Sequence, residues 1–270
     1  MKVKIHTITV WFAVFLVMLP IIWMFGTAFK SPTEILGSGA NLLPQQLSFS
    51  SFERLLDGNV LILVGNTLLI SIGATVVSVI LAFFSAYGLV RYRFPAKLDS
   101  VFLLAVLIVK MMPPIVIAIP LYSFMNDVGL LNTRIGLILA YQVYTLPFCI
   151  WMLLGFVRDI PLEIEEAGAM DGAHLLNRLA YIVFPLCAPG LVATAIFSMI
   201  LGWNEFLFSL LFLHTPDKFT IPLFISNFMT EDGTAWGELM AIGIISSLPM
   251  LILAGYLQRY LLRGFSMGLK

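Results

Sequence analysis

Charged residues are scarce in this sequence: Asp, Glu, Lys and Arg make up only 11% of its 270 residues, while 60% are hydrophobic. A chain of this size has too little polar surface to cover a water-soluble globule, so we expect a membrane protein. The formal net charge is zero. Without a basic excess to neutralise phosphates, nucleic acid is not expected as a partner.

Cysteine is scarce as well, because Cys149 and Cys187 are the only two and lie far apart in apolar surroundings. They imply no disulfide framework, and we expect them to be packing residues. The sequence also lacks a nucleotide-binding loop of the form G-x-x-x-x-G-K-[ST], so if ATP drives this protein, another chain binds it. An H-E-x-x-H metal pair, paired membrane aspartates and a distinctive Ser–His spacing are missing too, which argues against an intramembrane enzyme.

Long apolar runs make up most of the remainder. A spanning helix needs about 20 largely apolar residues. The segments that reach this length are roughly 8–29, 61–90, 99–120, 135–157, 181–210 and 239–262. We therefore predict an all-α polytopic membrane protein with six transmembrane helices, forming a single transmembrane domain over residues 1–270.

The placement of Lys and Arg predicts the orientation of these helices. With the N-terminus inside, the outer loops hold few basic residues and Lys110 lies within a span, so the positive-inside rule favours two cytoplasmic termini. The inner basic residues are Lys2, Lys4, Arg91, Arg93, Lys97, Arg158, Arg178, Arg259, Arg263 and Lys270, and the outer ones are Lys30, Arg54, Arg134 and Lys218.

One polar stretch interrupts the apolar sequence, and a short apolar motif follows it at a fixed distance. It runs Glu165-Glu166-Ala167-Gly168-Ala169-Met170-Asp171-Gly172-Ala173, and Ile182-Val183-Phe184-Pro185 begins nine residues after Gly172. The pattern resembles the EAA signature of membrane permeases of ATP-binding-cassette (ABC) importers: E-A-A, three residues, G, nine residues, I-x-L-P. Gly168 stands in place of the second Ala, and Phe184 in place of the Leu before proline.

The residues around this stretch predict two short helices joined by a turn. Asp159, Pro161 and Glu163 suit a helix start, and Asp171-Gly172 suits a stop with glycine at positive φ. The resemblance implies that residues 158–182 are a cytoplasmic coupling loop that docks onto an ATPase, with Glu166 and Asp171-Gly172 in its cleft. An acidic solvated loop is the alternative. The implied coupling residues are Glu165, Glu166, Ala167, Gly168, Asp171, Gly172 and Ala173.

Other segments extend the resemblance over nearly the whole chain. They are similar to the smaller permease subunit of maltose-type carbohydrate uptake transporters in Leu19 to Lys30, Ala86 to Phe94, Ile119-Pro120-Leu121, Gly202 to Phe206 and Gly264 to Gly268.

That family implies a type I ABC importer permease fold in a prokaryotic plasma (inner) membrane, with a sugar, di- or oligosaccharide, as the substrate. It also implies several partners: a second related permease, two ATPase subunits that bind ATP and Mg, an extracellular or periplasmic sugar-binding protein, and membrane lipid. No cofactor is expected on this chain itself. By resemblance, the outer loop from about Thr215 to Glu238 probes the binding protein, and the tail Phe265 to Lys270 reaches the ATPases. The alternatives are an inert connection for the loop and a frayed, solvated terminus for the tail.

Polar residues inside the apolar runs are costly against lipid, so they should face protein or a water-filled cavity. One interpretation is a substrate path; the other is hydrogen bonding between helices. Lys110 must pair, snorkel or reach water, and Met111-Met112-Pro113-Pro114 suggests a broken helix beside it. A competing function is a stand-alone secondary transporter or channel with an ion site at Lys110 and Glu205. The candidate path residues are Asn66, Lys110, Gln142, Tyr144, Asn204 and Glu205.

Overall fold

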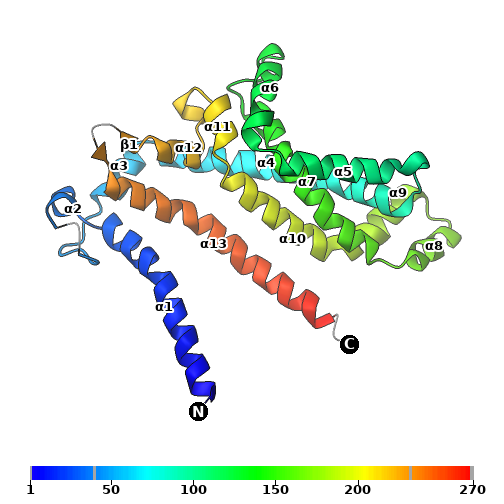
Figure 1. Ribbon diagram of the computed structural model, residues 1–270, viewed down its shortest axis with the longest axis horizontal. Coiled ribbons are helices and arrows are strands. Elements are labelled where there is room, and N and C mark those ends of the chain that lie inside the picture. Colours follow the sequence, from blue (N-terminus) through cyan, green and yellow to red (C-terminus); the bar gives the residue numbers. More distant parts are fainter. Residues whose placement is uncertain (1, 39–40, 231–232, 268–270) are drawn as a thin grey trace. The chain divides into compact units, whose positions relative to one another are not determined.

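The computed structural model describes residues 2–38, 41–230 and 233–267, most of them in helices (Figure 1). The elements are α1 (Lys2–Ala28), α2 (Pro32–Ser38), α3 (Ser50–Asp57), α4 (Val60–Arg91), η1 (Pro95–Lys97), α5 (Leu98–Met111), α6 (Pro114–Asp127), α7 (Arg134–Arg158), α8 (Leu162–Met170), α9 (Leu175–Arg178), η2 (Leu179–Val183), α10 (Phe184–Trp203), α11 (Leu207–Phe212), η3 (Pro216–Lys218), α12 (Ile221–Ser226), β1 (Met229–Thr230), β2 (Gly233–Thr234) and α13 (Trp236–Met267). The two short strands pair antiparallel.

Five helical stretches in the described part of the chain are long and apolar enough to cross a membrane. A sixth candidate is a pair of helices, Pro95–Met111 and Pro114–Asp127, which meet at an angle of 100°. The prediction of an all-helical membrane protein is confirmed. The five stretches are Thr7–Ala28, Val60–Arg91, Arg134–Arg158, Leu175–Trp203 and Trp236–Tyr256.

The predicted span over residues 99–120 is broken in its middle, at the place where Met111-Met112-Pro113-Pro114 suggested a broken helix. Met112 is extended, with φ −66° and ψ 139°, and α6 starts again at Pro114. A residue that precedes proline is pushed out of the helical region, and proline itself cannot donate to the helix ladder. The consecutive prolines Pro113 and Pro114 therefore end α5, and α6 leaves it in a new direction (Figure 1).

The predicted span over residues 181–210 is wrong at its C-terminal end, because its helix ends earlier than expected. Helix α10 ends at Trp203, and the short helix α11 begins at Leu207. The polar residues Asn204 and Glu205 lie in the connection between the two helices. Residues that the sequence suggested were inside a span are thus found at its end.

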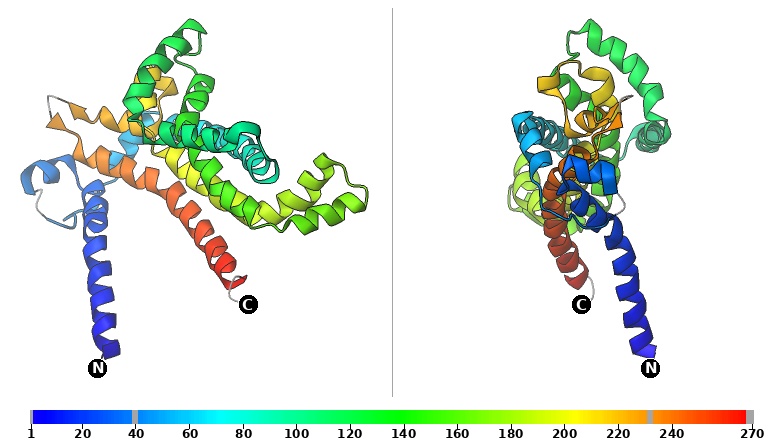
Figure 2. Two further views of the ribbon diagram at one scale, coloured as in Figure 1. Left: turned by 45° about the vertical axis from the view of Figure 1, so that its right-hand side comes forward. Right: turned by 90° about the vertical axis from the view of Figure 1, so that its left-hand side faces the viewer.

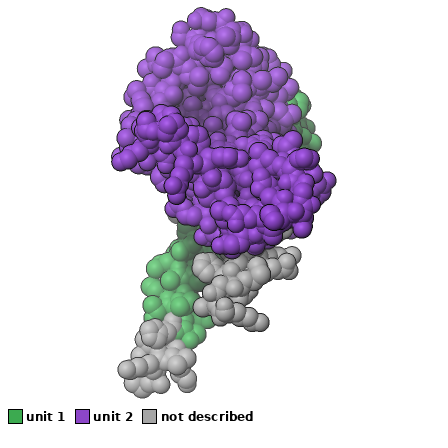
Figure 3. All heavy atoms as spheres, turned by 90° about the vertical axis from the view of Figure 1, so that its right-hand side faces the viewer, with its two compact units in different colours: residues 1–64, 223–250 green, residues 65–222, 251–270 purple. Residues whose placement is uncertain are grey.

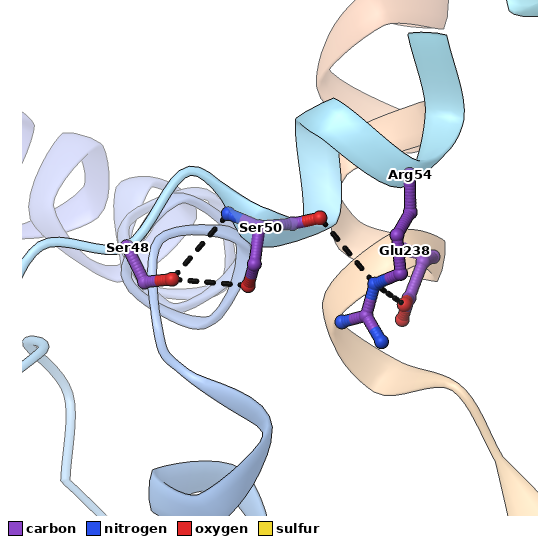
Figure 4. A network of polar contacts seen from close by, with 4 residues as sticks. All are labelled: Ser48, Ser50, Arg54 and Glu238. Carbon is purple, nitrogen blue, oxygen red and sulfur yellow. Dashed lines mark hydrogen bonds and ion pairs between the residues drawn. The ribbon is translucent and has the colours of Figure 1, made fainter. Parts of the chain in front are cut away.

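The chain divides into two compact units, residues 1–64 with 223–250 and residues 65–222 with 251–270 (Figure 3). In the first unit, the Arg54 Nε lies 2.8 Å from a carboxylate oxygen of Glu238 and also donates to the Ser50 carbonyl. This ion pair ties α3 to the start of α13. At the first residue of α3, the Ser48 hydroxyl donates to the Ser50 hydroxyl and accepts from the Ser50 N–H (Figure 4).

The core of the second unit lies where α4, α7 and α10 pack together. Small residues of α4, Ala82 and Ala86, are fully buried in one cluster with Leu153 and Val157 of α7. The two free cysteines are buried in the same core, as expected of packing residues. Helices α8 and α9 form a hairpin where α7 ends and α10 begins (Figures 1 and 2).

Candidate functional site

Residues 158–182, which the resemblance implies are a coupling segment, fold as the predicted pair of short helices with a tight stop between them. After α8, the Ala173 N–H donates to the Gly168 carbonyl at 3.0 Å and the Gly172 N–H donates to the Ala169 carbonyl at 3.0 Å. These are the two hydrogen bonds of a Schellman motif, which needs a left-handed residue just past the helix. Gly172 supplies it with a φ of 85°, as its position in the motif predicts.

The second half of the motif, Ile182 to Pro185, lies where the chain enters the membrane-spanning helix α10. Residues Leu179–Val183 form a π-helical turn that leads directly into α10. Pro185 follows it and has no amide hydrogen, so the ladder cannot continue unchanged through this point. Gly168 lies against this turn, because a Cβ added there would clash with the Ile182 Cδ1. The glycine at the second Ala position therefore leaves room for Ile182 of the same chain.

Glu165 faces the protein interior, although the resemblance placed it among the docking residues. Only 2% of it is exposed. Its Oε1 accepts from the Arg91 Nε at 2.7 Å, and its Oε2 accepts from the Tyr87 hydroxyl at 2.9 Å. Glu165 therefore fastens α8 to the end of α4, and a partner could reach its carboxylate only by displacing Arg91 or Tyr87.

The opposite side of the hairpin is open. Glu166 is exposed, and in the part of the chain that the structure describes its carboxylate has no polar partner. Met170 beside it is 89% exposed, and Ile164 is exposed as well. The remaining coupling residues are also accessible: Ala167, Asp171 and Gly172 are exposed, and Gly168 and Ala173 are half-buried.

Of the candidate path residues, Asn66 and Gln142 have side chains that are taken up by bonds inside the protein. The Asn66 amide donates to the carbonyls of Asp217 and Phe219 and accepts from Arg134, which holds the 213–220 loop against α4. Gln142 accepts from the Ser78 hydroxyl at 2.6 Å and donates to the Ala74 carbonyl, joining α7 to α4. Both have the hydrogen bonds between elements that were the alternative to a substrate path.

Asn204 and Glu205 lie between α10 and α11, and their side chains hydrogen-bond to the backbone of these two helices. Asn204 donates back to the Ile200 carbonyl at 2.8 Å. The Glu205 carboxylate, which is buried, accepts from the backbone N–H groups of Phe208 at 2.9 Å and Ser209 at 3.3 Å. A carboxylate in this position satisfies amides that have no partner in the first turn of α11 and lies at its positive end.

Lys110 and Tyr144 are the two candidates that share a cavity. They line a space of about 260 Å³ beside the α5–α6 break, together with Phe148, whose ring centroid lies 5.8 Å from the Lys110 Nζ. No ion pair joins Lys110 to Glu205 among the described residues, and the Glu205 carboxylate binds the start of α11 instead. Nor does the described part of the chain group three His, Cys, Asp or Glu side chains as a metal site requires.

Two further segments were expected to contact partners. Within the outer loop, Asn132 anchors the residues around Thr215: its side chain accepts from the His214 and Thr215 amides, and its carbonyl accepts from Lys218 at 2.8 Å. Residues 231–232 of this loop and residues 268–270 of the tail lie outside the described part of the chain.

Tyr87 and Arg91 are the functional candidates that sequence reasoning missed. Both stand in the Ala86 to Phe94 stretch that carries the family resemblance, and Arg91 was read only as an inner basic residue. Their partner Glu165 is more than 70 residues away in the chain. No local pattern predicts such a contact.

The chain is similar to known transport proteins over most of its length. Residues 75–267 match the family model described as "Binding-protein-dependent transport system inner membrane component". The diacetylchitobiose uptake system permease protein DasC of Streptomyces coelicolor is 33% identical over 92% of this chain and 90% of its own length. The trehalose transport system permease protein SugB of Mycobacterium tuberculosis is 33% identical over 93% of this chain and 91% of its own length.

A solved structure supports the same fold. One chain of a bacterial ABC transporter involved in the import of the acidic polysaccharide alginate superposes with a TM-score of 0.82 at 22% identity, covering 95% of each chain. The family match and the identity to the two permeases extend over far more than half of the sequence. The chain therefore belongs to the family of inner membrane components of binding-protein-dependent ABC transport systems.

Proposed function

We propose that this chain is a permease subunit of an ATP-driven sugar importer, and that its coupling segment receives an ATPase subunit on the cytoplasmic side. The importer would hold a second related permease and two ATPase subunits that bind ATP and Mg, and a binding protein would deliver the substrate from outside. The chain itself performs no catalysis. It converts closure and opening of the ATPases into exposure of a substrate path to one side of the membrane or the other.

The observation that carries this proposal is the division of the coupling segment into an anchored side and an open side. Glu165 binds inward to α4, while Glu166 has no polar partner in the described chain and stands beside the exposed Met170. An unpaired carboxylate next to exposed apolar surface suits a partner that offers a basic group and an apolar cleft. A merely solvated loop would have little reason to expose Met170.

Sugar is the proposed substrate class because the relatives suggest it. DasC is named for uptake of diacetylchitobiose and SugB for transport of trehalose, and both are disaccharides. The cavity that Lys110 and Tyr144 line is the candidate for this chain's share of the path, since aromatic faces with a few polar groups are the usual lining of small-molecule sites. The side chains of the other four candidates already form hydrogen bonds within the protein, and their part in the substrate path remains a proposal. These candidates are Asn66, Gln142, Asn204 and Glu205.

The test of the docking role is Glu166→Ala in the assembled importer. We expect about tenfold less ATPase retained on the purified permease, or about tenfold lower transport, because a charge pair at an interface is lost. Glu53→Ala is the matched control, since it removes another exposed carboxylate, on α3. ATPase retention and transport at the level of this control would remove the docking assignment.

A further inference from the structure

Tyr87 and Arg91 stand four residues apart on α4, on one face of the helix, and both reach the same carboxylate. Each oxygen of Glu165 receives one of them. The second branch of the Arg91 guanidinium, Nη2, donates to the Ile160 carbonyl at 2.8 Å. Arg91 therefore holds the turn that leaves α7 and the first turns of α8 at the same time.

This arrangement, the α4–α8 clamp of Tyr87, Arg91 and Glu165, is almost closed to solvent. The side chains of Arg91 and Glu165 are 10% and 2% exposed. Burying two charges costs several kcal/mol per ion, and the attraction offsets it only when the geometry is good and the remaining polar atoms are bonded. An apolar contact would hold α8 with less cost, so what the clamp adds is a fixed direction and distance between α8 and α4.

Two residues next to the clamp have the same side chains but make no polar contact with α8 in the part of the chain that the structure describes. Tyr92 and Arg93 follow at the same end of α4, and both are exposed. In the described residues neither side chain has a hydrogen bond or an ion pair. The polar contact to α8 is thus specific to Tyr87 and Arg91 and is not a general property of this basic helix end.

We infer that Tyr87 and Arg91 are positioning residues for ATP-driven transport, which act through Glu165 to make α8 and the end of α4 move as one body. The inference rests on the proposed docking of the coupling segment. Helix α8 continues from α7 through a short turn and packs against Ile182 just before α10, and the clamp adds a polar attachment to α4. A push on α8 then displaces α4 together with these helices, whereas an α8 without the clamp would move without α4.

The experiment compares Arg91→Gln and Tyr87→Phe with the matched variants Arg93→Gln and Tyr92→Phe. Each is assembled with the companion permease, the ATPases and the binding protein in proteoliposomes. Three quantities are measured: ATPase bound per permease, ATP hydrolysed, and sugar transported. We expect Arg91→Gln and Tyr87→Phe to keep their ATPase and to reduce the sugar transported per ATP by a factor of roughly ten or more, the size expected for a lost bond to a charged group. The matched variants should keep the wild-type ratio.

The ratio of sugar transported to ATP hydrolysed separates positioning from mere stability or docking. An unchanged ratio in both variants overturns the inference, and so does a parallel fall of bound ATPase and transport at constant ratio. If Arg91→Gln does not accumulate in the membrane, Tyr87→Phe decides alone, because it removes a single oxygen atom.

Glu166→Ala, run alongside, separates failure of this inference from failure of the proposed function. A defective Glu166→Ala with normal clamp variants rejects only the clamp. A normal Glu166→Ala rejects the docking and the clamp together.

Discussion

At the scale of single residues, the two glycines of the motif are under different constraints, one of backbone conformation and one of space. Gly172 has a φ of 85°, which is a region that residues with a Cβ rarely adopt. Gly168 has ordinary helical geometry and is small because Ile182 packs over it. The departure of this chain from the E-A-A pattern is therefore matched inside the same chain by a bulky residue fourteen positions later.

This pairing predicts the outcome of restoring the second alanine. Gly168→Ala gains about 1 kcal/mol of helix propensity, but the Ile182 Cδ1 must move to admit the methyl group, so the two effects should roughly cancel. In the Ile182→Val background, which lacks the Cδ1 atom, the same substitution should stabilise the coupling segment by about 1 kcal/mol. Hydrogen exchange of the α8 amides in the purified protein measures this. Slower exchange in Gly168→Ala than in wild type would show that Ile182 gives way without cost.

At the scale of elements, the breaks in the helices position the polar residues. Pro113 and Pro114 divide α5 from α6, and the cavity with Lys110 and Tyr144 lies beside that break. The stop after Trp203 places Glu205 at the start of α11. In an uninterrupted helix these polar side chains would face lipid or a neighbouring helix. Because of the breaks, Lys110 and Tyr144 line a cavity and Glu205 binds backbone N–H groups.

The two roles considered for Glu205 predict different effects of two substitutions. As a cap of α11, Glu205→Gln should be mild because one oxygen can still accept, whereas Glu205→Ala should lower stability by about 1 to 2 kcal/mol. Neither should change which sugar is preferred. Thermal unfolding in detergent and competition transport with several sugars measure both effects. A shift of sugar preference in Glu205→Gln at wild-type stability would return this residue to the substrate path.

At the scale of the whole molecule, the orientation in the membrane is the expectation still to be tested. The bias of Lys and Arg predicts both termini in the cytoplasm, with α2 outside and α8 inside. A cysteine introduced at Leu36 should react with a membrane-impermeant thiol reagent from outside, and one at Glu163 only after the inner face is opened. Cys149 and Cys187 are buried and should stay silent. Labelling of Leu36→Cys only from the cytoplasmic side would reverse the topology.

Much of the membrane architecture was predictable, because the bilayer imposes a length and a composition on each span. The runs at 61–90 and 135–157 differ from α4 and α7 by one residue at each end. The motif likewise predicted the stop at Gly172, which depends on local backbone geometry alone. Family membership was predictable for the same reason, since the spacing between Gly172 and Pro185 is written in the sequence.

What the sequence determined by itself is local: which segments are apolar enough to span, where proline and glycine end a helix, and which family the motif indicates. The tertiary structure decided the roles of the polar side chains. Glu165 and Glu166 are adjacent and chemically identical, yet one is buried against Arg91 and the other is exposed. Asn66 and Gln142 looked like path residues and hold elements together. The physical reason is that a polar group in a membrane protein must find a partner, and the partners lie on elements far away in the sequence that only the packed helices bring within reach.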